Sequence, residues 1–247
     1  DWSSDVCSSD LYNPDNAVIV LAGDVDTVRG EELVERYFGS ISRHTATSTG
    51  LQFSAENRNV GHARETQDVP FDACFLAYHC EGFLNDETMI ADVLSAILSD
   101  GRSSRLYKAL QHDAQLASDF GAHADKREFT SLFTLYAISC DPSIDADKLH
   151  SVFANEIHHI VDKGVLHVEV AKAKNILKTR LAYQLQTSGG VADMLTQQVL
   201  FWNDPERIHL LMKKIEKLTV DEVNDFARKI FVGDGVRLDI CAGERRD

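Results

Sequence analysis

The stretch DETMIADVLSAILSDGRSSRLYKALQHDAQLAS, residues 86–118, decides the fold because it predicts two helices joined by a tight turn. Asp86 can accept hydrogen bonds from the first turn of one helix, and Gly101 can end that helix in a left-handed conformation. Ser103 or Ser104 can then cap the second helix. Apolar residues recur at helical spacing in both segments, at Met89, Ile90, Val93, Leu94, Ile97 and Leu98 and then at Leu106, Tyr107 and Leu110. The stretch therefore predicts two packed helices and by itself indicates no chemistry.

Strand-like and helix-like segments flank this pair of helices. Residues 69–80 alternate in the manner of a half-buried strand. Residues 117–124 and 131–139 predict two further strands, the second of them apolar on both faces. Residues 145–231 predict three to five helices, with apolar stripes such as Leu149, Val152, Phe153, Ile157, Ile160 and Val161. The chain thus combines strands and helices in one long segment.

Composition and charge narrow the classes of protein. The chain has 247 residues, of which 44% are hydrophobic and 26% charged, as in soluble globular proteins. Wholly apolar runs reach only six residues, whereas a membrane-spanning helix needs about 20, so no membrane span is expected. The net charge of −14 fits a solvated acidic surface, or an acidic wall that attracts basic peptides. Nucleic acid is not an expected partner, because phosphate binding requires clustered basic residues.

The five cysteines predict buried free thiols, because the sequence contains no C-x-x-C pair. Cys74 and Cys80 lie in one predicted strand, roughly 20 Å apart, which is too far for a disulfide bond. The compartment stays open between the bacterial periplasm and the cytoplasm.

The end of the chain repeats a pattern found near its beginning. Residues 17–22 (AVIVLA) predict a buried strand before Gly23, and Asp26 or Thr27 can begin a helix that ends near Phe38. Ala242-Gly243-Glu244 follows the last predicted strand as Ala22-Gly23-Asp24 follows the first. The likeness is either chance or the mark of two similar domains.

On the second interpretation the chain has four segments. Residues 1–11 are a non-native, adapter-like segment, and residues 12–42 are the end of a truncated first domain. Residues 43–59 have the Ser, Thr, Asn and Gly content of a linker, and residues 60–247 form a complete second domain.

Three stretches resemble the pitrilysin/insulinase family of zinc metallopeptidases: SSRLYKAL at 103–110, YNPDNAVIVLAGDVD at 12–26 and LTVDEV at 218–223. They stand in the family's order and span residues 12–247. The resemblance implies the C-terminal, non-metal-binding domain of such an enzyme. It also implies an α+β fold, a largely antiparallel sheet with helices packed on one face, preceded by the last strand and helix of a similar domain. The intact enzyme would hydrolyse peptides with a zinc-activated water in a chamber between two halves.

The residues that this chemistry requires are absent from the chain. The family's zinc motif is H-x-x-E-H, and none of the ten histidines has another histidine four residues away. Glu156 and His159 make only half a site, and His79 fits a hydrogen-bonded core residue better than a ligand. Gly101-Arg-Ser-Ser-Arg lacks the second glycine of a nucleophile elbow. No catalytic residue and no metal ligand is therefore expected here, and zinc is expected in the intact parent protein.

The resemblance also implies where substrate contacts would lie. The family's second half can contribute an Arg and a Tyr, seven residues apart, in the pattern L-R-E-x-x-G-L-A-Y. The matching run, residues 110–118, has Gln111 at the Arg position and Ser118 at the Tyr position, so the pair is absent. Neither side chain can supply a fixed positive charge or a phenol.

The expected partners follow from the same resemblance. They are the missing N-terminal domain of the same protein, a partner subunit that carries the Arg/Tyr pair, and a peptide substrate. The chain would form the substrate-chamber wall and the partner interface, and would be inactive alone. One alternative is a non-catalytic structural subunit of the same fold that scaffolds a partner, and another is an unrelated α+β binding module.

Overall fold

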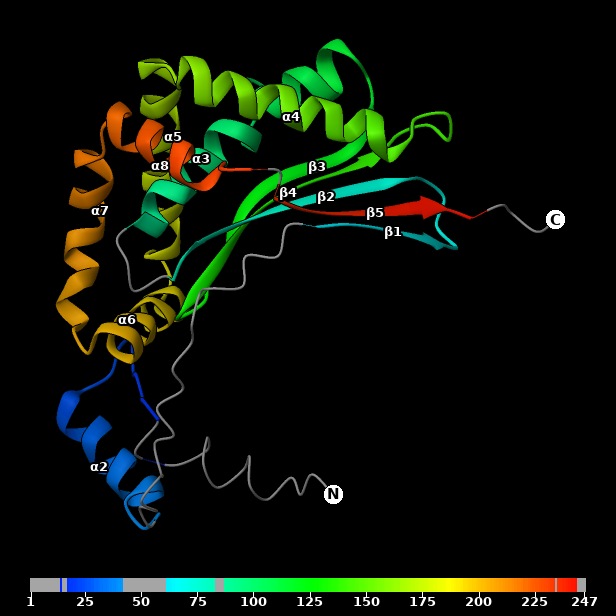
Figure 1. Ribbon diagram of the computed structural model, residues 1–247. Helices are drawn as coiled ribbons and strands as arrows, with labels where there is room; N and C mark the ends of the chain where they lie inside the picture. The colour runs from blue at the N-terminus through cyan, green and yellow to red at the C-terminus, as the bar shows by residue number, and fades with distance from the viewer. Residues whose placement is uncertain (1–13, 15–16, 42–60, 83–86, 234, 244–247) are drawn as a thin grey trace. The chain divides into compact units, whose positions relative to one another are not determined.

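The computed structural model of the chain describes residues 14, 17–41, 61–82, 87–233 and 235–243 (Figure 1). The predicted adapter-like segment, the linker and the predicted cap Asp86 lie outside these residues. The chain forms two compact units, one from residues 1–53 and 180–211 and the other from residues 54–179 and 212–247. Each unit is described separately.

The larger unit contains a five-stranded sheet in the order β1-β5-β2-β4-β3. The strands are β1 (Gly61–Gln67), β2 (Ala73–Glu81), β3 (Ala117–Asp125), β4 (Thr130–Ser139) and β5 (Val236–Ala242). β1 and β5 run parallel, and all other neighbours are antiparallel. The expected largely antiparallel α+β sheet is therefore confirmed. The strand predicted at 69–80 begins later, at Ala73, and β1 was not predicted at all.

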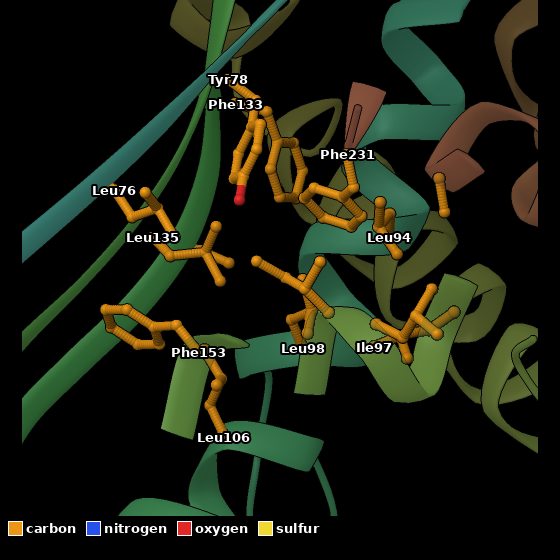
Figure 2. Packing of buried hydrophobic residues seen from close by; sticks show 14 of the residues in the cluster. Leu76, Tyr78, Leu94, Ile97, Leu98, Leu106, Phe133, Leu135, Phe153 and Phe231 are labelled. Atoms are coloured by element: carbon orange, nitrogen blue, oxygen red, sulfur yellow. The ribbon is translucent and has the colours of Figure 1, made fainter. Parts of the chain in front are cut away.

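Helices α3 (Glu87–Ser99), α4 (Ala146–Lys163) and α8 (Val220–Ile230) pack on one face of this sheet, the covered face (Figure 1). Alternate strand residues point into that layer because side chains alternate across a strand. Figure 2 shows the resulting core, in which apolar side chains of β2 and β4 meet those of the helices, among them Leu76, Tyr78, Phe133, Leu135, Leu94, Leu98, Phe153 and Phe231. The rings of Tyr78 and Phe133 both meet Phe231 edge-on, at 5.0 and 5.8 Å. The buried stripe predicted for α3 is thus confirmed.

The second helix of the deciding stretch differs from the prediction. It runs as a π-helix, η2 (Tyr107–Asp113), and it begins without a side-chain cap. The hydroxyl of Ser104 is instead buried and has no hydrogen-bond partner among the described residues. Leu106 and Leu110 are fully buried, as predicted. Packing of these two leucines therefore holds the segment in place where a cap was expected.

The structure has five α-helices between residues 145 and 231, within the predicted number of three to five. Besides α4 and α8 these are α5 (His167–Gln184), α6 (Ser188–Trp202) and α7 (Ile208–Lys217), with a 3-10 turn, η3 (Pro205–Arg207), before α7. α5 and α7 have residues in both units.

The smaller unit contains α2 (Thr27–Phe38), which Asp26 caps by accepting a 2.9 Å hydrogen bond from the backbone N–H of Arg29. This helix agrees with the prediction. The strand predicted at residues 17–22 does not form, because no described strand lies beside it to share hydrogen bonds. Its residues still alternate in exposure as an extended segment would, with Ile19 and Leu21 on the exposed side.

One charged cluster lies within the covered face. The side chain of Asp239 on β5 is fully buried and binds two residues of β1, His62 at 2.7 Å and Arg64 at 3.0 Å. Arg237, two residues away on β5, binds both Asp239 and Asp147 of α4, and Asp147 also binds Arg64 at 2.9 Å. This cluster, the Asp239 cluster, joins β1, β5 and α4.

The cluster keeps Asp239 ionised. Burial alone would raise the pKa of Asp239, but hydrogen bonds from Arg237, His62 and Arg64 outweigh it and lower the pKa to about 2. Since the ordinary value is 3.8, the folded state favours the carboxylate by about 2 kcal/mol at neutral pH. This contribution is present above pH 3.8 and is lost as the pH falls through 2.

We expect Asp239→Asn to lower the free energy of unfolding by about 3 kcal/mol at pH 7, because it leaves two guanidinium groups without their buried counter-charge. Urea denaturation followed by circular dichroism measures this loss. The difference from the unsubstituted chain should shrink as the pH falls from about 4 towards 2. Asp225→Asn is the control, since Asp225 is exposed and pairs with its helix neighbour Arg228, and it should leave stability nearly unchanged. Equal losses for the two variants would contradict the role of the cluster.

Candidate functional site

The structure brings together the two positions that match the family's Arg/Tyr pair. Gln111 lies on η2 and Ser118 lies near the start of β3. The Gln111 Nε2 is 3.5 Å from the carbonyl oxygen of Ser118. The Ser118 hydroxyl donates to the carbonyl of Ser139 on β4 at 3.0 Å. Both side chains therefore bind backbone groups, and neither supplies a charge at this position.

Next to this position lies the face of the sheet that points away from α3, α4 and α8, the open face. Its residues alternate with those of the core and are half-exposed: Phe75, Ala77, His79, Thr134, Tyr136, Ile138, Leu238 and Ile240. Most of them are apolar or aromatic. The open face is thus an apolar surface that no helix of the described part of this unit covers.

Tyr136 is the central polar group of the open face. Its ring stacks on Phe75 at 6.3 Å and meets His123 edge-on at 6.2 Å, while its hydroxyl donates to the Asp119 carboxylate at 3.5 Å. Burial first, and the Asp119 charge second, raise the pKa of Tyr136 above its ordinary value. The phenol therefore stays protonated at neutral pH and can donate or accept a hydrogen bond.

Gly121 makes room for this ring. It pairs with Tyr136 across β3 and β4, and a Cβ atom at Gly121 would clash with Tyr136 Cε1. The sequence reasoning did not identify Tyr136, Asp119 or His123. The only signal in the sequence was that residues 131–139 are apolar on both faces, which indicated that the second face of β4 is also an apolar surface.

The middle of the β3 edge of the sheet cannot pair with another strand. The hydroxyls of Ser95 and Ser99 on α3 both donate to the carbonyl of Ala122, and Asp92 forms an ion pair with Lys126. α3 therefore satisfies and shields this edge. The open face, rather than the β3 edge, is the surface of β3 and β4 that is available to a ligand.

His159, which the sequence offered only as half of a site with Glu156, is exposed on α4. Within the described residues no three His, Cys, Asp or Glu side chains gather as metal ligands. His79 is half-exposed on the open face, so its prediction as a core residue is wrong: it falls on the strand face opposite the core.

The thiol predictions hold for two of the cysteines. Cys74 and Cys80 are free and buried, and burial raises their pKa to about 12 and about 11. Both thiols therefore stay protonated and unreactive at neutral pH.

Comparisons with known proteins show what the chain is similar to. The family model described as "Peptidase M16 inactive domain" matches residues 8–177. A zinc protease of Helicobacter pylori, PqqE, is 23% identical over 223 residues, which cover 89% of this chain and 50% of that protein. The chain therefore spans about half the length of such relatives.

Solved structures share the fold. A protease from Helicobacter pylori superposes with a TM-score of 0.87 and 21% identity, covering 97% of this chain and 59% of that one. A chain of complex III2 from Candida albicans superposes with a TM-score of 0.71 and 20% identity, covering 89% of this chain and 53% of that one. Among the described residues, no helix combines the length and apolar character needed to cross a membrane.

Gly121→Ala should displace the ring of Tyr136 and lower the free energy of unfolding by about 1–2 kcal/mol, as overpacking does. Thermal or urea unfolding measures the loss. Gly61→Ala is the matched control on a strand, because a Cβ there meets nothing within 4 Å. In a Tyr136→Ala background the cost of Gly121→Ala should largely disappear. An undiminished cost in that background would show that backbone strain, and not the ring, makes glycine necessary.

Proposed function

Because this chain belongs to the peptidase M16 inactive-domain family, we propose that it is the C-terminal part of a two-part zinc peptidase and forms a wall of that enzyme's substrate chamber. The parent protein would hydrolyse peptides with a water molecule activated by zinc. The metal would be held by the other part, and this chain would position the peptide.

The open face carries this proposal. It is apolar over three adjacent strands, from Leu238 and Ile240 on β5 through Phe75 on β2 to Tyr136 on β4. A large uncovered apolar face on a folded domain marks a surface that meets another molecule. Extended peptides present side chains to both sides, so apolar residues with an interspersed phenol suit their capture.

The acidic groups beside this face suggest which peptides bind. Asp119 lies on β3 at the same side of the sheet as His123, as does Asp125, whose carboxylate is already paired with Arg127 at 2.7 Å. Asp119 already faces the Tyr136 hydroxyl. The overall charge of −14 would further raise the local concentration of basic peptides. We infer a preference for substrates with a Lys or Arg next to an apolar residue.

This chain supplies no replacement for the Arg/Tyr pair at its usual position. Gln111 and Ser118 are engaged with backbone carbonyls, and neither can stabilise a developing negative charge as a guanidinium would. The chain is therefore expected to be inactive alone. A partner subunit with the pair would complete the site.

A second candidate is a scaffold of the same fold with no peptidase activity. The similarity to a chain of complex III2 from Candida albicans is the observation in favour of the scaffold. The two candidates differ in the parent's N-terminal part, where a peptidase requires H-x-x-E-H and a scaffold does not.

Photo-cross-linking tests the chamber wall. We expect a benzoylphenylalanine placed at position 136 of the whole parent protein to cross-link a basic apolar peptide when the metal is chelated to stop turnover. The same group at position 158, on the exposed side of α4, is the control and should not cross-link. Equal labelling at the two positions would exclude the open face as the peptide surface.

A peptidase assay tests the parent's activity. The purified 247-residue chain should not cleave a quenched peptide with added zinc, whereas the whole parent should. Cleavage by the chain alone would overturn the assignment. An inert parent that still binds a partner protein would favour the scaffold.

A further inference from the structure

We propose that a cavity between α5 and the junction of α7 and α8 binds a free amino acid or a dipeptide with an apolar side chain. The ligand's carboxylate pairs with Lys178 and its ammonium pairs with Glu216. The cavity has a volume of about 500 Å³, and all its lining residues belong to the larger unit. It shares no lining residue with the open face, so this inference does not depend on the proposed function.

The cavity follows from the sequence of α5. Six residues of this helix line it, at the spacing of a single helix face: His167, Val170, Ala171, Lys174, Asn175 and Lys178. A face with this spacing closes against its neighbours when its residues are apolar. After Ala171 the remaining members are polar, so this face cannot close by apolar packing along its whole length. A cavity remains beside the α7–α8 junction.

The wall opposite α5 is held in place by the chain itself. The Lys174 ammonium donates to the carbonyls of Glu216 and Leu218 at the end of α7, both at 2.6 Å. The last carbonyls of a helix lack intrahelical partners and attract a cation. Directly after them, Thr219 and Glu222 form a reciprocal capping box at the start of α8. The cavity is therefore preformed, and its wall needs no ligand to hold it.

The least exposed part of the lining is apolar. Val170 is buried, and Leu218 and Val220 are half-buried and pack against the core of the unit. Small-molecule sites typically have roughly 300–1,000 Å³ of space, a mainly apolar lining and a few polar groups that fix the ligand's orientation. The cavity has this size and this distribution of groups. Its inner part suits an apolar side chain.

Lys178 and Glu216 supply two opposite charges to the lining. The Lys178 Nζ lies 3.6 Å from the Glu216 Oε1, beyond hydrogen-bond distance, and the two side chains are 31% and 57% exposed. An exposed ion pair of this kind adds little stability, so a ligand can separate the two groups at small cost. A ligand carboxylate then accepts hydrogen bonds from Lys178, and a ligand ammonium donates to Glu216.

The closeness of the two charges limits the size of the ligand. A single amino acid or a dipeptide carries its ammonium and carboxylate near each other, whereas a long peptide separates them. An internal peptide segment has neither charge, and a simple anion would face the Glu216 carboxylate. The small zwitterion with an apolar side chain is therefore the occupant that satisfies both the charges and the apolar lining.

Calorimetric titration of the 247-residue chain tests the ligand class. We expect L-leucine or leucyl-leucine to bind with a dissociation constant of at most about 1 mM. N-acetylleucinamide has the same side chain and neither charge, and 4-methylpentanoate has the carboxylate alone. Both should bind at least about 10-fold more weakly than the better zwitterion, because each loses charge-assisted hydrogen bonds. Equal binding of either compound, or no binding of both zwitterions, would overturn the proposal.

Variants test the location of the site. Lys178→Gln and Glu216→Gln should each weaken binding of the better zwitterion at least about 10-fold. Lys213→Gln is the matched control, since Lys213 is an exposed residue of α7 that does not line the cavity, and it should bind as the unsubstituted chain does. Ala171→Phe should abolish binding by filling the cavity while both charges stay. Ala171 is exposed, so this variant should retain its circular dichroism spectrum. Unchanged binding by Ala171→Phe, or an equal loss in Lys213→Gln, would exclude this cavity as the site.

Discussion

Strands β2 and β4 of the larger unit are apolar on both faces, yet the described helices cover only one, and this imbalance governs the rest of the structure. On the covered face Leu76, Phe133 and Leu135 are buried beneath α3, α4 and α8. On the open face Phe75 and Tyr136 remain half-exposed. Exposed apolar surface costs about 25 cal/mol per Å², and a domain that functions alone has polar residues there. The open face is therefore the surface on which the proposed function depends.

A charge contact, and not apolar packing, fixes the strand at one edge of this sheet. Every residue of β1 is exposed, and its side chains reach the covered face through His62 and Arg64 bound to Asp239. Buried ion pairs add little net stability, but they can specify one arrangement over others. A shift of one residue in the β1 register would turn both side chains to the open face. The Asp239 cluster thus sets the register of the strand by which the chain enters this unit.

Local periodicity predicted most of the fold, and long-range contacts determined the rest. The stripes of α3 and α4 and the alternation of β2 depend on near neighbours, so the sequence was sufficient for them. β1 was missed because its pattern is polar and its partner Asp239 lies at the far end of the chain. Gln111 and Ser118 lie close together because only seven residues separate them in the sequence. The place of Tyr136 could not be predicted in this way, because it depends on Gly121, which pairs with it between β3 and β4.

The two copies of the strand–turn pattern show how the neighbours of a strand decide its residues. In β5 the residue that points toward the helices is Asp239. It can be buried because two cations, Arg64 of β1 and Arg237 of β5, bind it. Asp147 of α4 balances the charge of these cations. At residues 17–22 the equivalent position is Ile19, which could not bind such cations and gains only from apolar cover. The two copies therefore cannot exchange places, although their patterns match. The likeness of the two stretches thus lies in their apolar pattern and turn, and the side chain at the matching position differs in chemistry.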